Sequence, residues 1–298
     1  PEVRLDSAHR FGYLLDLPSR PSMFSPFRPR RTHCYLFAHV AKCGGTTLVE
    51  MFGRWGRGGI CLAEPTSSRA AIVAEARNTI ARRKLPRERV ELFYGHRVHY
   101  GLHELSSLPP RYFTFLRDPL TRVVSLYNHH CGIADDPRHR HHLRDRQVMG
   151  TAEARLPFME WLQTVYTGNH MVRFLAFAAE GEDPAMPGEI GDAELQRALR
   201  FLDRCWFVGM TESSAVDLPF VCKAMGLKPP RARANVSRVF QHPGDPVISE
   251  AVAAKEALDM QLHRYARALR ERGSIEPIPA LAAQASPTAG VRFSEGDR

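Results

Sequence analysis

Two short stretches of this sequence carry the residue types that can hold an anion. In the first, HVAKCGGTT, Lys42 stands before the glycine pair Gly44 and Gly45, and Thr46 and Thr47 follow. A glycine pair lets the backbone turn tightly and bring its N–H groups close to a ligand. A helix that begins at the threonines would add exposed amides of its own. We therefore expect an anion cradle here, with the lysine ammonium beside it.

The order of residues in this loop argues against an ordinary nucleoside triphosphate. A Walker A loop, GxxxxGK[ST], places its lysine after the glycines, whereas Lys42 precedes them. No acidic residue stands at an obvious strand end to hold a magnesium ion. A plain glycine turn with an exposed lysine is the alternative that this loop leaves open when it is taken alone.

The second stretch, FTFLRDPLTRVVSLY, places Arg117 at the end of an apolar run. Asp118 can cap a following helix, and Pro119 suits the first turn of that helix. Ser125 lies within the first two turns, so it and the arginine could reach one anion. A guanidinium donates paired hydrogen bonds to phosphate oxygens. The alternative is a surface arginine beside an unrelated serine.

A histidine-rich segment, GHRVHYGLHEL, supplies candidates for proton transfer. His96 directly follows the glycine that ends an apolar run, so its side chain is expected to point beyond a strand end. Histidine suits a general base because its unperturbed pKa lies near neutral pH. His99 is the second candidate for the base, and Arg97 and His99 are candidates for substrate contacts. A surface or core-edge histidine is the alternative.

These residues need elements that bring them together. Apolar runs predict buried strands at residues 34–40, 90–95, 111–116 and 205–210. Helical patterns follow them at residues 46–53, 120–130, 214–226 and 249–270. Strands that are apolar on both faces and separated by helices indicate a mostly parallel sheet with helices on each side. Ligands of such α/β sheets bind beyond the carboxyl ends of the strands, which is where each motif lies.

The folded domain is expected to span residues 33–272. Residues 1–32 are rich in proline and arginine and are expected to form an irregular arm. Residues 273–298 are rich in proline, alanine and serine without a sustained period, which is typical of a disordered tail. No apolar run approaches the roughly 20 residues that span a bilayer.

The chain of 298 residues is strongly basic, with a formal net charge of +9 and a pI near 9.5. Such a charge favours polyanionic partners, namely nucleic acid, an anionic membrane, a charged glycan or a nucleotide. No RNP, helix-turn-helix or zinc-finger pattern is present, so we expect no nucleic-acid partner. A polyanion-binding or nucleic-acid-binding module and a P-loop nucleotide kinase are the alternatives that we keep open.

The segment NHHCGIADDPRHRHHLRDR, residues 128–146, combines histidines with arginines. Zinc needs four fixed ligands, whereas these histidines are interleaved with arginines whose charges repel a cation. We therefore expect no metal site. One interpretation is a basic loop bordering an acceptor site, where Arg138 and Arg140 would hold carboxylate or sulfate groups. The other is a solvated, mobile loop.

Together, HVAKCGGTTL and FTFLRDPLTRVVSLY resemble the sulfotransferases, specifically the membrane-type carbohydrate group that includes heparan sulfate 2-O-sulfotransferase. In that family the first motif binds the 5′-phosphosulfate of 3′-phosphoadenosine-5′-phosphosulfate (PAPS), and the second binds its 3′-phosphate. The resemblance therefore implies a P-loop-like sulfotransferase fold and PAPS as co-substrate, without a metal. The nucleotide-binding residues that it implies are Lys42, Cys43, Gly44, Gly45, Thr46, Thr47, Arg117 and Ser125.

The resemblance also implies roles in the reaction. His96 matches the family's GH element, in which the histidine is the catalytic base, and Lys42 would stabilise the leaving phosphate. FVGMTE, NHMVRFLA and ARANVSR are weaker family blocks, and Arg238 in the last belongs to a loop expected to close over the nucleotide. The implied acceptor carries a hydroxyl group, and we expect an anionic saccharide.

Two positions depart from the family motif, because Ala41 and Cys43 stand where proline and threonine are usual. Near a helix N-terminus, Cys43 either has a lowered pKa and is oxidisable, or it is an inert filler. The chain's six cysteines form no CxxC pair, which favours a reducing compartment. We therefore expect a cytoplasmic protein, or one in the Golgi lumen if an N-terminal anchor has been removed.

Overall fold

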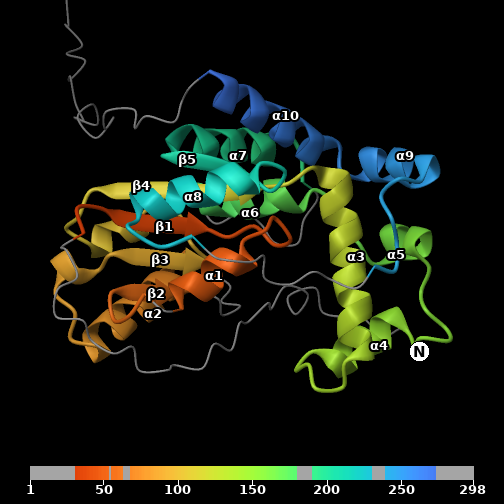
Figure 1. Ribbon diagram of the computed structural model, residues 1–298, viewed down its shortest axis with the longest axis horizontal. Helices are drawn as coiled ribbons and strands as arrows, with labels where there is room; N and C mark the ends of the chain where they lie inside the picture. Colours follow the sequence, from red (N-terminus) through yellow and green to blue (C-terminus); the bar gives the residue numbers. More distant parts are fainter. Residues whose placement is uncertain (1–30, 54, 63–67, 180–189, 230–238, 273–298) are drawn as a thin grey trace, which may run out of the picture.

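The computed structural model describes residues 31–53, 55–62, 68–179, 190–229 and 239–272 (Figure 1). The predicted tail at residues 273–298, the predicted arm up to residue 30, and Arg238 therefore lie outside the described residues.

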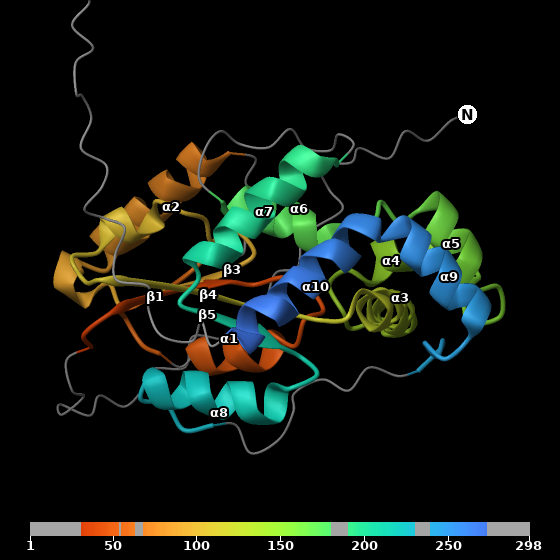
Figure 2. The same ribbon diagram turned by 90° about the horizontal axis from the view of Figure 1, so that it is seen from above.

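A five-stranded parallel sheet forms the centre of the described chain, with the strand order β2-β3-β1-β4-β5. Helices cover both of its faces, as the view from above shows (Figure 2). This confirms the α/β fold that the sequence predicts. The strands are β1 (Cys34–Ala38), β2 (Gly59–Cys61), β3 (Leu92–Gly95), β4 (Pro110–Leu116) and β5 (Phe207–Met210).

The central strand β1 shows why the sequence forms this sheet. Successive side chains of a strand point to opposite faces, so Cys34, Leu36 and Ala38 enter one core while Tyr35 and Phe37 enter the other. All five residues are buried. A strand that is apolar on both faces is stable only between two layers of helices, and β1 has such layers on both sides.

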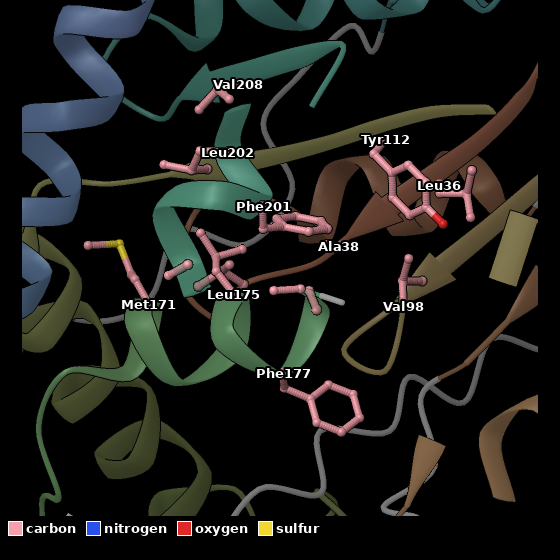
Figure 3. Close-up of a cluster of buried hydrophobic side chains, with 14 of the residues drawn as sticks. Leu36, Ala38, Val98, Tyr112, Met171, Leu175, Phe177, Phe201, Leu202 and Val208 are labelled. Atoms are coloured by element: carbon pink, nitrogen blue, oxygen red, sulfur yellow. The ribbon is translucent and has the colours of Figure 1, made fainter. Parts of the chain in front are cut away.

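The two faces of the sheet carry different helices. On one face α2 (Arg69–Arg82), α6 (His170–Ala178), α7 (Asp192–Arg204) and α10 (Ala257–Glu271) pack around the core drawn in Figure 3. In that core, Leu175 and Phe201 from two helices meet Leu36 and Tyr112 from two strands. On the other face lie α1 (Thr46–Phe52) and α8 (Ser214–Ala224).

A third group of helices lies beyond one end of the sheet (Figure 1). Its members are α3 (Pro119–Asp135), α4 (His142–Met149), α5 (Phe158–Thr164) and α9 (Pro246–Lys255). They share a core of their own that contains Tyr127 and Trp161. Two short 3-10 turns, η2 (Arg87–Arg89) and η3 (Leu102–Leu105), complete the described elements.

A buried ionic network ties α3 to the helices that follow it. The guanidinium of Arg122 lies 3.2 Å from Glu256, between α9 and α10, and 3.9 Å from Asp259. All three side chains are fully buried. Asp259 accepts hydrogen bonds from the first amides of α6, while the Asn169 side chain accepts from the first amides of α10. Charges this deep are tolerated only when they are paired, so the network fixes how these helices meet.

The structure differs from the sequence prediction in several elements. The strand β2 was not predicted, and β1 ends at Ala38 instead of residue 40. The predicted helix 249–270 is two helices, because Glu256 between them turns its side chain inward to Arg122. The prediction of a loop at residues 128–146 is wrong, since α3 continues to Asp135 and α4 begins at His142, which leaves only a turn at residues 136–141.

Candidate functional site

The loops that carry the candidate residues meet at one edge of the sheet. In the parallel register, Ala38 at the end of β1 pairs with Gly95 at the end of β3 and with Thr114 of β4. Leu116 at the end of β4 pairs with Met210 at the end of β5. The segments that follow these strands therefore leave the sheet side by side, as predicted for an α/β binding site.

The loop between β1 and α1 has an unusual backbone. Lys42 has a φ of 66°, and Gly44 has a φ of 76°. A left-handed conformation costs a lysine roughly 1 kcal/mol, and residues held in such regions cluster at functional sites. The first turn of α1 is closed by the amide of Val49, which donates to the carbonyl of Gly45 at 2.9 Å, so the loop leads directly into the N-terminus of the helix. The loop thus brings two left-handed residues to the start of a helix.

Lys42 and Arg117 lie together. The Nη1 atom of Arg117 donates to the backbone carbonyl oxygen of Lys42 at 3.4 Å, and its Nε atom donates to Thr121 at 3.1 Å. Burial, and then the charge of Arg117, lowers the pKa of Lys42 to about 8. Burial also lowers the pKa of Arg117. Lys42 is still protonated at neutral pH, so two partly desolvated cations share this place, an arrangement that a bound anion would relieve.

The carboxylates near Arg117 accept hydrogen bonds from backbone amides at the start of α3. The carboxylate of Asp118 accepts a hydrogen bond from the amide of Thr121 at 2.9 Å, which caps the helix as predicted. Glu212, just after β5, accepts from the amide of Asp118 at 2.8 Å. These bonds place carboxylates at the positive end of the helix, which leaves the guanidinium of Arg117 bonded to Thr121 and to the loop.

His96 has a defined tautomer. Its Nδ1 atom lies 2.7 Å from the backbone carbonyl oxygen of His39. A carbonyl oxygen only accepts, so Nδ1 carries the proton and Nε2 keeps a lone pair. Burial lowers the pKa of His96 to about 4, and the charge of Arg97 acts in the same direction. The imidazole is therefore neutral at pH 7, which is the form that a proton acceptor needs.

The side chain of His39 is a feature that the sequence prediction missed. Its ring stacks on that of His96, with centroids 4.4 Å apart and planes 18° from parallel. Burial, and then the charges of His96 and Lys42, lowers the pKa of His39 well below its ordinary value. The sequence prediction included His39 in the buried strand 34–40 and therefore gave it no role in the site. Its place directly before the glycine loop is the signal that could have found it.

The remaining predicted nucleotide-binding residues differ in exposure. Thr47 is buried, while Thr46 and Ser125 are partly exposed. Cys43 is fully buried, and burial raises the pKa of its thiol to about 12. The hypothesis of a lowered cysteine pKa is therefore wrong, and the filler interpretation agrees with the burial of the side chain.

The structure does not bring the four candidate substrate-binding residues together. Arg97 lies over the ring of Phe177 at 5.5 Å, whereas His99 is buried and meets the same ring edge-on at 6.1 Å. Arg138, on the turn between α3 and α4, is largely exposed and bonds Asp136 at 3.1 Å. Arg140 is exposed on the same turn.

The histidines of α3 serve packing and charge contacts. His130 lies 2.9 Å from Asp145 of α4, so this pair joins the two helices. Burial, and then the charge of Lys42, lowers the pKa of His129 to about 3, which places this side of α3 near the glycine loop. In the described residues, no group of three or more histidine, cysteine or acidic side chains is arranged to hold a metal ion. No described helix is both long and apolar enough to span a bilayer.

Comparison with known proteins adds one finding. A family model described as the sulfotransferase family matches residues 26–186, more than half of the chain. The matched segment contains the glycine loop, His96 and the start of α3 with Arg117. No curated protein matches the chain.

Proposed function

We propose, from the premise that this chain belongs to the sulfotransferase family, that it transfers the sulfuryl group of PAPS to a hydroxyl group of a saccharide. The observation that carries the proposal is the meeting of Lys42 and Arg117. These residues come from separate motifs, yet the Arg117 guanidinium lies 3.4 Å from the Lys42 carbonyl oxygen. Two cations at one end of a parallel sheet suit a ligand that carries more than one anionic group.

The residues present fit this co-substrate. Gly44 has a left-handed backbone, and a Cβ atom added at Gly45 would lie 2.2 Å from the ring of His39, so the loop has no room for side chains there. Its amides and the Lys42 ammonium would hold the 5′-phosphosulfate, while Arg117 and Ser125 would hold the 3′-phosphate. When bound, PAPS supplies an activated sulfuryl group with a phosphate as leaving group.

The chain's own residues then have defined tasks. The Nε2 atom of His96 accepts the proton of the acceptor hydroxyl, because its Nδ1 proton is engaged by the His39 carbonyl. The ammonium of Lys42 donates to the oxygen on which negative charge develops as the bond to sulfur breaks. The pKa of His96 is about 4 in the protein alone, and bound anions would raise it toward a more effective value.

An extended acceptor fits the arrangement of the basic residues. α3 has 17 residues, so at ~1.5 Å per residue it is about 25 Å long. Arg117 precedes its first turn, whereas Arg138 and Arg140 follow its last. An acceptor bound beside the nucleotide, at the start of α3, would reach Arg138 and Arg140 only if it were a polymer. The net charge of +9 favours an anionic one, which supports a charged glycan as the acceptor class.

A ranking of ligands by thermal shift tests the proposed function. We expect 3′-phosphoadenosine-5′-phosphate (PAP) to raise the unfolding temperature more than ATP with magnesium or a DNA oligomer at equal concentration, because only the protein's folded state binds the matching ligand. A larger shift with ATP would favour a nucleotide kinase instead. A larger shift with DNA would favour the nucleic-acid-binding module.

Replacement of Arg117 by alanine tests the proposed 3′-phosphate site. Charge-assisted hydrogen bonds contribute about 1.5–3 kcal/mol, so we expect the affinity for PAP to fall about 10-fold to 100-fold in calorimetric titration. Adenosine 5′-phosphosulfate, which lacks the 3′-phosphate, should lose far less affinity. Arg264→Ala is the matched control, because Arg264 is exposed on α10. Unchanged PAP affinity in Arg117→Ala would contradict the assignment.

A further inference from the structure

A column of rings runs from the sheet to α6 through the proposed base. Phe37 stacks on His39 with centroids 5.4 Å apart, and His39 stacks on His96 at 4.4 Å. Phe174 of α6 lies on this column with its centroid 5.5 Å from that of His96. His39 is therefore held between the fully buried ring of Phe37 and the imidazole of His96.

The same ring also touches the glycine loop. A Cβ atom built at Gly45 would lie 2.2 Å from Cδ2 and 2.4 Å from Nε2 of His39, distances that no real Cβ contact shows. The edge of the ring thus occupies the space that a side chain at Gly45 would need. One face of His39 contacts His96, and one edge contacts the loop backbone.

Backbone bonding alone does not fix the orientation of His96. The hydrogen bond from Nδ1 to the His39 carbonyl sets the tautomer, but that bond does not by itself fix the tilt of the ring plane. A face-to-face neighbour at 4.4 Å removes this freedom. Catalysis is sensitive to such placement, since errors near 1 Å can cost about 100-fold in rate.

We propose that His39 is a positioning residue, whose side chain holds the His96 imidazole in a fixed orientation relative to the glycine loop. The proposal rests on the function proposed above, because it takes His96 as the base. The role belongs to the flat face of the His39 ring, and its nitrogen atoms are not required. A phenylalanine at this position should therefore replace it, while an alanine should not.

The charges around the pair are consistent with this role. Burial lowers the pKa of both rings. The charges of His96 and Lys42 lower the pKa of His39 further, and the charge of Arg97 lowers that of His96. Both rings are neutral at pH 7 for this reason and because they are buried. When His96 takes a proton, it lies against a neutral aromatic face, which tolerates a cation better than a second imidazolium would.

Variants of His39 test the proposal by rate and by pH profile. We expect His39→Ala to lower kcat about 30-fold, with PAP affinity within about 3-fold of the unchanged protein. His39→Phe should stay within about 3-fold of the unchanged rate. Removal of the ring admits water beside His96, so the acid limb of kcat/KM should move from near pH 4 toward the ordinary histidine value of about 6.5. His103→Ala, at a histidine bonded to Tyr112, is the control and should leave rate and limb unchanged.

A second measurement does not depend on transfer. Nitrogen NMR of the histidine rings should show the Nδ1-protonated tautomer of His96, and its titration should move upward in His39→Ala but not in His39→Phe. If the unchanged protein transfers no sulfuryl group, the proposed function fails, and the NMR comparison still tests the contact.

Two outcomes would overturn the proposal. One is a His39→Phe variant as slow as His39→Ala. The other is a rate loss that is equal at every pH, with the titration of His96 unmoved. Should His39→Ala fail to fold, His39→Leu keeps the volume without the flat face and should still lose about 10-fold in kcat.

Discussion

Replacement of His96 by alanine is expected to reduce the rate of sulfuryl transfer about 10³-fold, the middle of the range for loss of a general base. The affinity for PAP should stay within about 3-fold, because the ring bonds the His39 backbone and stacks on side chains rather than forming part of the loop. Transfer from labelled PAPS to a panel of saccharides measures the rate, and calorimetric titration with PAP measures the affinity.

A matched variant separates chemistry from packing at this position. His96→Gln keeps a side-chain amide that can donate to the His39 carbonyl, yet it cannot accept a proton at neutral pH. We expect it to be as slow as His96→Ala while unfolding at a temperature closer to that of the unchanged protein. Full turnover by either variant would remove His96 from the role of base.

Replacement of Lys42 by methionine is expected to reduce kcat about 10²-fold to 10³-fold, as for the loss of one group that stabilises developing negative charge. Methionine has a similar unbranched stem, so the left-handed backbone at φ 66° should be no more strained than with lysine. The effect should therefore fall on kcat rather than on the amount of folded protein.

The pH profile of the unchanged protein gives a further measurement for Lys42. The protonated ammonium is the active form, and its pKa is about 8 in the protein alone, so kcat/KM should fall as the pH rises through that value. Lys42→Met should lack this alkaline limb, whereas Lys42→Arg should move it above the measured range. An unchanged kcat and limb in Lys42→Met would show that the ammonium does not act in the reaction.

The sequence was informative where the chemistry is local. The apolar run at residues 34–40 predicted β1, and the Asp118-Pro119 pair predicted the start of α3 and its cap. The strand β2 was missed because a run of three residues that begins at a glycine carries no periodic signal. Strand order and register depend on contacts between distant segments, which no single stretch encodes.

In the candidate site, too, local features were predicted and contacts between distant segments were predicted only in part. The meeting of Lys42 and Arg117 was expected from their places after parallel strands. The packing of His39 against His96 was not, because it joins segments that lie 57 residues apart in the sequence. Burial also reversed the expectation for Cys43, since a thiol enclosed by side chains is desolvated whatever lies near it in sequence.

The helical end of the molecule was the hardest part to predict. The segment at residues 128–146 looked like a loop because its histidines and arginines are polar, yet His130 of α3 bonds Asp145 of α4 and so holds the two helices together. The break between α9 and α10 came from a buried acidic residue, Glu256, whose partner Arg122 lies far away in the sequence. Tertiary pairing overrode local pattern in both places.

The ionic network of Arg122 bears on how much of the polypeptide is needed for a working enzyme. Its carboxylate partners, Glu256 and Asp259, lie well past residue 186, where the match to the family ends, and so does β5. Truncation at that boundary would leave the Arg122 guanidinium buried without an acidic partner, which would lower the free energy of unfolding by about 3–5 kcal/mol. The smallest autonomous unit must therefore reach through α10, so the family match covers the proposed nucleotide-binding motifs but ends before the folded unit does.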